Sequence, residues 1–375
     1  MNQIGLQGLE KKRQNSFDLV RLAAALCVLI AHQFSLAEQY LPHYHLSSLG
    51  TVGPKLADVG LYIFFALSGF LIFKSLEADG RVHRFLTARF LRIYPAAIVN
   101  TMVCILLGAI ISTDVGYWRA TETWQYLFHN SAILWTPTQF QLPGVLSNAR
   151  YPSVNVPIWT LKYELSAYLA LLAVNRIAQR GIAERLILIG AAAFFTAGVC
   201  YLRTYPPEGG DGLETLSSFN TVHLFRFFML FFVGACYAAH ELSGRQKTIG
   251  LLSVSLALIF APTLAIGRTL ALIVIAIAAI EVGRSSLLFS TRYARLGDLS
   301  YGTYLYAFPI QHYTIVNWLT DRNFYELLAA DILLILICAL LSWKIVEQPS
   351  LRQKIPRRNQ EMDRLIEKGA LIVRP

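Results

Sequence analysis

The chain has 375 residues, of which 55% are hydrophobic and only 15% charged, with a mean hydropathy of +0.47. Soluble proteins carry about 25% charged residues, so this composition excludes an ordinary soluble domain. Apolar runs of about 20 residues, the length that crosses a bilayer core, recur along the chain. We therefore predict an all-α, polytopic integral membrane protein, with a membrane domain over residues 1–350 and a short basic tail over 351–375.

The hydrophobic pattern predicts about ten transmembrane helices. The first lacks a small-residue cleavage site and leads directly into further spans, so we expect it to be retained and not removed as a signal peptide. The seventh is short. The expected spans are Phe17–Ala37, Leu56–Leu76, Tyr94–Ser112, Val156–Asn175, Leu186–Arg203, Val222–Glu241, Ile249–Phe260, Gly267–Gly283, Gly297–Trp318 and Glu326–Ile345.

The basic residues lie mostly on one side of these spans. Most of the 33 lysines and arginines fall in the two termini and in every second loop, and the positive-inside rule then places both termini in the cytoplasm. An even number of spans agrees with this orientation. The net charge of +10 follows from the same bias and predicts contact with anionic membrane lipids, not with nucleic acid.

The first span contains costly ionisable groups at its two ends. Arg21 and His32 are eleven residues apart, which is about three helical turns, so they share a face roughly 16 Å apart along the axis. The residues between them on that face, Ala25 and Val28, are small, and Asp18 lies near Arg21 as an expected ion-pair partner. This face would suit a long, thin ligand with a phosphorylated head. The alternative is that Arg21 reaches lipid phosphates and His32 hydrogen-bonds to a neighbouring helix.

Other spans place ionisable groups at a depth similar to that of His32. Glu164, Arg226 and His312 each lie within a few turns of the predicted outer end of a span. Four helices that each bring one such group to the same layer indicate a polar cavity, because ionisable groups are expensive in hydrocarbon. The alternative is a set of independent structural pairs.

On the cytoplasmic side, Arg89 and Arg92 lie three residues apart, on one helix face just before the third span. Paired guanidinium groups are well suited to phosphate. The alternative interpretation is that they belong to the general excess of positive charge on this side.

The five cysteines all lie in apolar stretches and no CxxC motif occurs, so we expect neither a disulfide nor a metal site. The connection over Thr113–Asn155 is long and rich in aromatic residues and proline. Such a loop suits a membrane interface, where it would form a lid or a re-entrant segment.

Taken in order, these features resemble the acyltransferase family 3 membrane proteins, which O-acylate bacterial surface glycans and related molecules. The resemblance covers about Asn15 to Leu351. One departure is Ala307, at which many members have a histidine, so no role is assigned to His312. The motifs that carry the resemblance are the Arg21 and His32 pair, the Arg89 and Arg92 pair, "VGLYIFFALSGFLI", Trp159 and Glu164 in "WTLKYELSAYL", "LGDLSYGTYLYAFPIQ" and "SWKIVEQP".

The resemblance implies an acyl-CoA-dependent O-acyltransferase of the bacterial cytoplasmic (inner) membrane. The donor would be acetyl-CoA, the commoner choice, or a longer or acidic acyl-CoA. No permanently bound cofactor is expected. The donor phosphates would lie near Arg21, Arg89 and Arg92, with Asp18 orienting Arg21. The acceptor would be a glycan, an exopolysaccharide or a lipid-linked sugar.

For the chemistry, His32 is the candidate general base, because imidazole has a pKa near the working pH. Glu164 would orient it or bind the acceptor. Arg226 would stabilise the thioester oxyanion or hold an acidic sugar, and a covalent acyl-histidine is a further possibility. The competing class is a proton-coupled transporter or flippase, which also uses intramembrane His, Glu and Arg. The sequence shows no repeat that relates two halves, which disfavours that class.

Overall fold

The computed structural model describes residues 15–41, 56–150, 152–178, 181–206, 219–240, 263–286, 296–320 and 323–353, together with a few single positions between 246 and 293. Within these ranges the chain is helical and contains no β-strand. The long helices are α2 (Phe17–Ala37), α3 (Leu56–Ala78), α4 (Val82–Ile111), α6 (Leu161–Ala178), α7 (Ile182–Thr204), α8 (Thr221–Ala239), α10 (Leu264–Arg284), α12 (Ser300–Trp318) and α13 (Phe324–Ser342). The shorter elements are α5 (Thr121–Ser131), the 3₁₀ turn η1 (Pro157–Thr160), the π-helical turn η2 (Trp343–Glu347) and α14 (Gln348–Arg352).

Each predicted span coincides with a helix, except Ile249–Phe260, of which the structure describes only single helical positions at Gly250, Leu252 and Leu256. The third helix is longer than expected, because α4 begins at Val82 and not at Tyr94. Among the described residues, seven helices are long and apolar enough to cross a membrane. The total of about ten and the cytoplasmic placement of both termini stay predictions.

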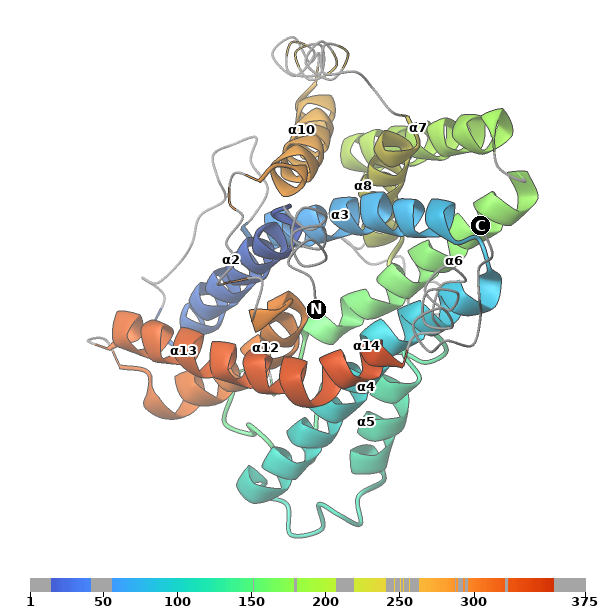
Figure 1. The fold of residues 1–375 in the computed structure, drawn as a ribbon. Coiled ribbons are helices and arrows are strands. Elements are labelled where there is room, and N and C mark those ends of the chain that lie inside the picture. Colours follow the sequence, from blue (N-terminus) through green and yellow to red (C-terminus); the bar gives the residue numbers. More distant parts are fainter. Residues whose placement is uncertain are drawn as a thin grey trace, which may run out of the picture.

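The helices α6 and α12 are not among those seven. Both are comparatively polar, and α12 is buried along most of its length. Figure 1 shows α12 behind α13 and close to α2. Because neighbouring helices cover α12, it tolerates polar side chains that would be costly against lipid. These two polar helices supply the interior of the site described below.

The central contact of the bundle is between α3 and α8 (Figure 1). Glycines allow the two backbones to approach: a Cβ on Gly69 would collide with the carbonyl of Phe231, and one on Gly234 with the carbonyl of Ala66. Small residues at crossing points are the usual basis of close helix packing in membranes. Above and below the crossing, aromatic rings fill the core, and Phe65 stacks on Phe227 at 4.2 Å between centroids.

Substitution Gly234→Val is expected to lower the free energy of unfolding by ~1–3 kcal/mol, since the new side chain meets backbone that has no room to move. Thermal unfolding in detergent measures the effect. Gly190→Val on α7 is the matched control, because nothing lies within 4 Å of the Cβ that it adds. Equal destabilisation by both substitutions would show that helix propensity, and not the crossing, sets the cost.

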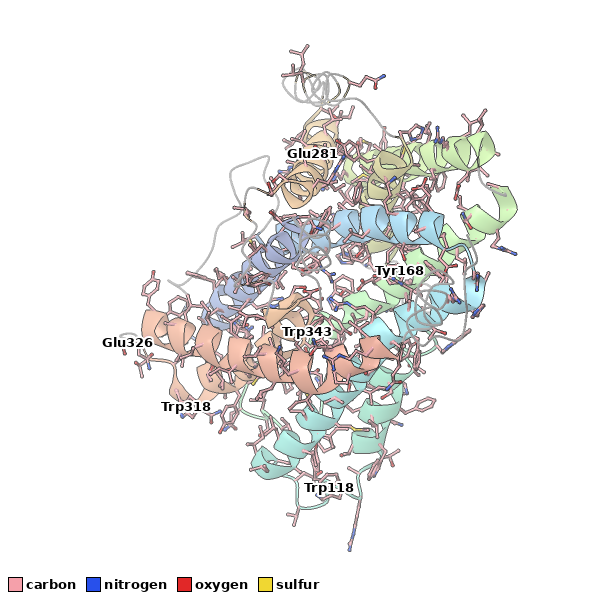
Figure 2. All side chains as sticks on the ribbon, in the orientation of Figure 1. Trp118, Tyr168, Glu281, Trp318, Glu326 and Trp343 are labelled. Carbon is pink, nitrogen blue, oxygen red and sulfur yellow. The ribbon has the colours of Figure 1, made fainter. Side chains whose placement is uncertain are left out.

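The long connection after α4 folds against the end of that helix. It contains α5 and has a small core of its own, in which Tyr117 and Tyr126 pack with Cys104 of α4. Trp118 lies at the far end of α4 and α5 in Figure 2 and is half exposed. The end of the connection enters the bundle, where the Asn155 side chain donates to the carbonyl of Leu305 at 3.1 Å. The expectation that this connection forms a lid or a re-entrant segment stays a prediction.

Candidate active site

A cluster of four charged groups joins the end of α2 to α4, α12 and η2. Arg21 Nη1 lies 3.1 Å from Asp298 Oδ2, and Arg92 Nη2 lies 2.5 Å from the same oxygen. Arg92 also approaches Glu347, with 3.6 Å between Nη1 and Oε2. Both carboxylates are buried. Two arginines and two carboxylates on four separate segments therefore fix this end of the bundle.

The position of Asp298 depends on its neighbours in the sequence. Gly297 has φ +91°, in the left-handed region that favours glycine, and a Cβ there would collide with the indole of Trp343. Asp298 Oδ1 then accepts hydrogen bonds from the backbone N–H and hydroxyl of Ser300, at 3.1 and 2.5 Å. The segment Gly297-Asp298-Leu299-Ser300 thus aims a carboxylate at the two arginines.

The electrostatics of Asp298 follow from these contacts. Burial raises the pKa of the carboxyl, but the positive charges of Arg21 and Arg92 and the hydrogen bonds from Ser300 outweigh that effect. The net result is a pKa below the usual value. Asp298 is therefore a permanent anion at neutral pH.

Glu347 reaches the cluster because the last helix changes its winding. The π-helical turn η2 follows α13, and the Ser342 hydroxyl donates to Glu347 Oε1 at 3.1 Å. Extra residues in a helical turn re-aim side chains and are common at functional sites. Here the turn directs Trp343 against Gly297 and Glu347 towards Arg92, so the segments around Gly297 and Trp343 form one unit.

A cavity begins at this charged end and runs into the bundle. It encloses about 530 Å³ of space not occupied by atoms and is lined by side chains of α2, α3, α4, α6 and α12. Arg21 and Arg92 lie at one part of its wall, and Ser68, Glu164 and Tyr304 line other parts. The cavity therefore connects two guanidinium groups with an interior carboxylate, which is the arrangement that a ligand with an anionic head requires.

Arg89 lies apart from this cavity although it is only one turn from Arg92. Its guanidinium is over the rings of Phe85 and Tyr168, at 5.7 and 5.8 Å from their centroids, and Tyr168 donates a hydrogen bond to Glu164. Tyr168 lies among the helices in Figure 2. Arg89 lines a second space of about 510 Å³ between α4 and α6, and it forms no ion pair with a described residue.

His32 does not line the cavity. Its ring lies edge-on to Phe308, with 5.3 Å between centroids, and its Nδ1 is buried with no hydrogen-bond partner. Phe308 is one turn beyond Tyr304 on α12, and Tyr304 lines the cavity. Ala25 and Val28, which we expected to border a passage from Arg21 to His32, are instead buried in helix packing.

The remaining polar groups at this depth have separate surroundings. Arg226 of α8 hydrogen-bonds to the hydroxyl of Tyr62 on α3. His312 lies 2.7 Å from the carbonyl of Ser153, in the inner end of the long connection. Of the four groups predicted to share a layer, His32 and His312 both contact the ring of Phe308, with 5.3 and 5.5 Å between centroids. Glu164, which accepts a hydrogen bond from Tyr168, and Arg226 have other contacts.

We expected Asp18 to be the ion-pair partner of Arg21. The structure pairs Arg21 with Asp298, and Asp18 is exposed. Sequence reasoning missed Asp298 and Glu347 altogether. The signal for both was present in the quoted segments "LGDLSYG" and "SWKIVEQP", each of which places a carboxylate beside a predicted cytoplasmic span end.

A known protein family and known proteins match most of this chain. Residues 14–343 match the model of a family described as an acyltransferase domain, Acyl_transf_3. The chain is 26% identical over 356 residues to a protein named O-acetyl transferase from Shigella phage Sf6, covering 92% of this chain and 98% of that protein. It is also 26% identical over 361 residues to nodulation protein 10 of Rhizobium leguminosarum bv. viciae, covering 90% of this chain and 94% of that protein. No solved structure matches the chain significantly.

Proposed function

The chain belongs to acyltransferase family 3, and on that premise we propose that it transfers an acyl group from a cytoplasmic acyl-CoA to a hydroxyl of an extracytoplasmic glycan or lipid-linked sugar. The observation that supports this most is the cavity between the Arg21 and Arg92 end and Glu164. The relative named O-acetyl transferase supports acetyl as the acyl group.

The charged end is the proposed site for the phosphates of the donor. Arg21 and Arg92 line the cavity, but Asp298 and Glu347 balance their charges. Arg89 forms no ion pair with a described residue, so we assign it a stronger attraction for phosphate than Arg21 or Arg92. Asp298 and Glu347 hold the side chains of Arg21 and Arg92 in place when no ligand is bound. Less conformational entropy is therefore lost when a ligand binds.

His32 is the proposed general base. It takes the proton of the acceptor hydroxyl as that oxygen attacks the thioester carbonyl carbon; the C–S bond then breaks, and the CoA thiolate receives the proton. Because His32 does not line the cavity and its ring contacts Phe308, we propose that the Phe308 ring turns to let the thioester reach His32. Direct transfer and an acyl-histidine intermediate both use this geometry. Glu164 is the group next to the thioester end of the cavity, and its assigned role is to orient the reactants.

The test is acyl transfer by the purified full chain in detergent, with labelled acetyl-CoA and a panel of glycans. We expect label on a glycan hydroxyl, released by mild alkali as expected for an ester. Transport of the same compounds is measured with the protein in sealed vesicles. Gradient-dependent uptake without any acylation in detergent would instead support the transporter class and remove this proposal.

A further inference from the structure

A second group of arginines lies at the opposite end of the bundle from Asp298. Arg203 is the penultimate residue of α7, while Arg226 and Arg268 lie in the first two turns of α8 and α10. Asp58 lies at the start of α3, next to them. The alternation of helix directions puts all four on the side that the positive-inside rule predicts to be extracytoplasmic. Basic residues on that side are disfavoured, so their presence requires a reason.

The three arginines interact with one another. Arg203 lies within electrostatic range of both Arg226 and Arg268, and these like charges oppose one another. Among the described residues, Asp58 is the acidic group within range of Arg203. Charged groups that are partly withdrawn from water are normally paired. The part of the chain that the structure describes thus places three arginines, Arg203, Arg226 and Arg268, near one carboxylate.

The hydrogen bonding of the cluster is also incomplete. Arg203 and Arg226 are both half-buried, and the Nε of each is buried without a hydrogen-bond partner. Arg226 donates to Tyr62, whose side chain is fully buried and holds the guanidinium in place. Two fixed guanidinium groups with unsatisfied donors, on adjacent helices, are complementary to the oxygens of a phosphate or carboxylate.

The cluster is adjacent to the proposed active-site cavity. Tyr62 directly follows Leu61 on α3, and Leu61 lines that cavity. Phe227 follows Arg226 and stacks on Phe65, another residue of the cavity wall. Short connections along α3 and α8 therefore link the arginine cluster to residues of the cavity wall. The outer surface of α7 is exposed, so a lipid-linked molecule has lateral access.

We propose that Arg203 and Arg226, with Arg268 behind them, bind an oxyanion of the acyl acceptor. This rests on the proposed function, and it extends that function by naming an anionic acceptor. The oxyanion is the diphosphate of a lipid-linked sugar or the carboxylate of an acidic sugar, which share the same chemistry of recognition.

The first experiment measures binding, independently of catalysis. The thermal unfolding midpoint of the purified full chain, with the donor end saturated by CoA, is followed against inorganic diphosphate, glucuronate and glucose. We expect diphosphate or glucuronate, but not glucose, to raise the midpoint. Arg203→Gln and Arg226→Gln should each weaken this binding roughly tenfold or more, since each removes hydrogen bonds to a charged group. The control Arg119→Gln removes an exposed arginine on the same predicted extracytoplasmic side and should leave the binding of diphosphate and glucuronate unchanged.

The probe that raises the unfolding midpoint identifies the source of the oxyanion. A response to diphosphate alone supports a lipid-linked acceptor, and a response to glucuronate alone supports an acidic sugar. If one of the two arginine variants fails to fold, the other variant still tests the proposal. Equal binding in both variants and the wild type overturns the proposal. So does a response only to vesicles of phosphatidylglycerol, because the arginines would then bind bulk lipid.

The second experiment separates this inference from the proposed function. In acyl transfer, both variants should raise KM for an anionic acceptor, and Arg203→Gln should leave acetyl-CoA turnover with a neutral acceptor unchanged. Equal losses with both acceptors would overturn the acceptor site while acyl transfer itself stands. Arginine-dependent binding of diphosphate in a protein that acylates nothing would remove the proposed function and, with it, the assignment of the anion to an acceptor.

Discussion

The His32→Gln protein is expected to insert and fold normally but to transfer acyl groups ~10²–10⁴ times more slowly than the wild type, the usual contribution of a general base. Folding should survive because the buried Nδ1 makes no hydrogen bond and the ring contacts Phe308 by its edge. Glutamine keeps much of the volume and removes the basic nitrogen. The measurement is kcat for acetyl transfer, together with the affinity for acetyl-CoA, which should change little because Arg21 is about 16 Å away.

Glu164→Gln is the informative comparison for this prediction. Glu164 lines the cavity and His32 does not, so a carboxylate acting as the base is the clearest alternative. If Glu164→Gln removes activity while His32→Gln retains it, the base has been assigned to the wrong residue. If both lose activity and only Glu164→Gln raises KM for the acceptor, the assigned roles stand. Size-exclusion profiles and thermal unfolding establish that each variant is folded.

The sequence was sufficient for the helices and for one end of the site. Apolar runs of about 20 residues predicted the position of the described long helices, because a segment in lipid must satisfy its own backbone hydrogen bonds. The Arg89 and Arg92 spacing predicted two guanidinium groups on a helix, and both lie on the continuous α4. The positions of side chains around a single helix are local geometry, which follows directly from the spacing of the residues in the sequence.

The spacing of residues along the sequence does not show which face of each helix packs against its neighbours. Asp298 is 206 residues from Arg92, and no periodicity links them. Ala25 and Val28 illustrate the same limit. Small side chains suit both a narrow passage and a close contact between helices. Here a Cβ on Gly60 would collide with the Val28 side chain, so the close contact between α2 and α3 is the arrangement that forms. The sequence gives only an expected depth for Arg226 and His312, whereas their contacts with Tyr62 and with Ser153 depend on rotation about the helix axis.

The Asp298→Asn protein is expected to lose ~3–5 kcal/mol of unfolding free energy, because breaking a buried ion pair leaves its partner charges uncompensated. Arg21 loses its ion-pair partner, and Arg92 keeps only the longer contact with Glu347. Asp79→Asn is the matched control. Asp79 also bridges two arginines, Arg81 and Arg84, but at a more exposed surface where such pairs contribute about 1 kcal/mol or less.

The pH dependence gives a second test of the same prediction. Because the folded protein lowers the pKa of Asp298 below the ordinary value of 3.8, its stabilising effect is fully present above that value. It is lost as the pH falls through the lowered pKa. The difference in unfolding free energy between the wild type and Asp298→Asn should therefore stay constant from about pH 5 to 8 and shrink only in stronger acid. A difference that disappears near neutral pH would mean that Asp298 is not the permanent anion that holds Arg21 and Arg92.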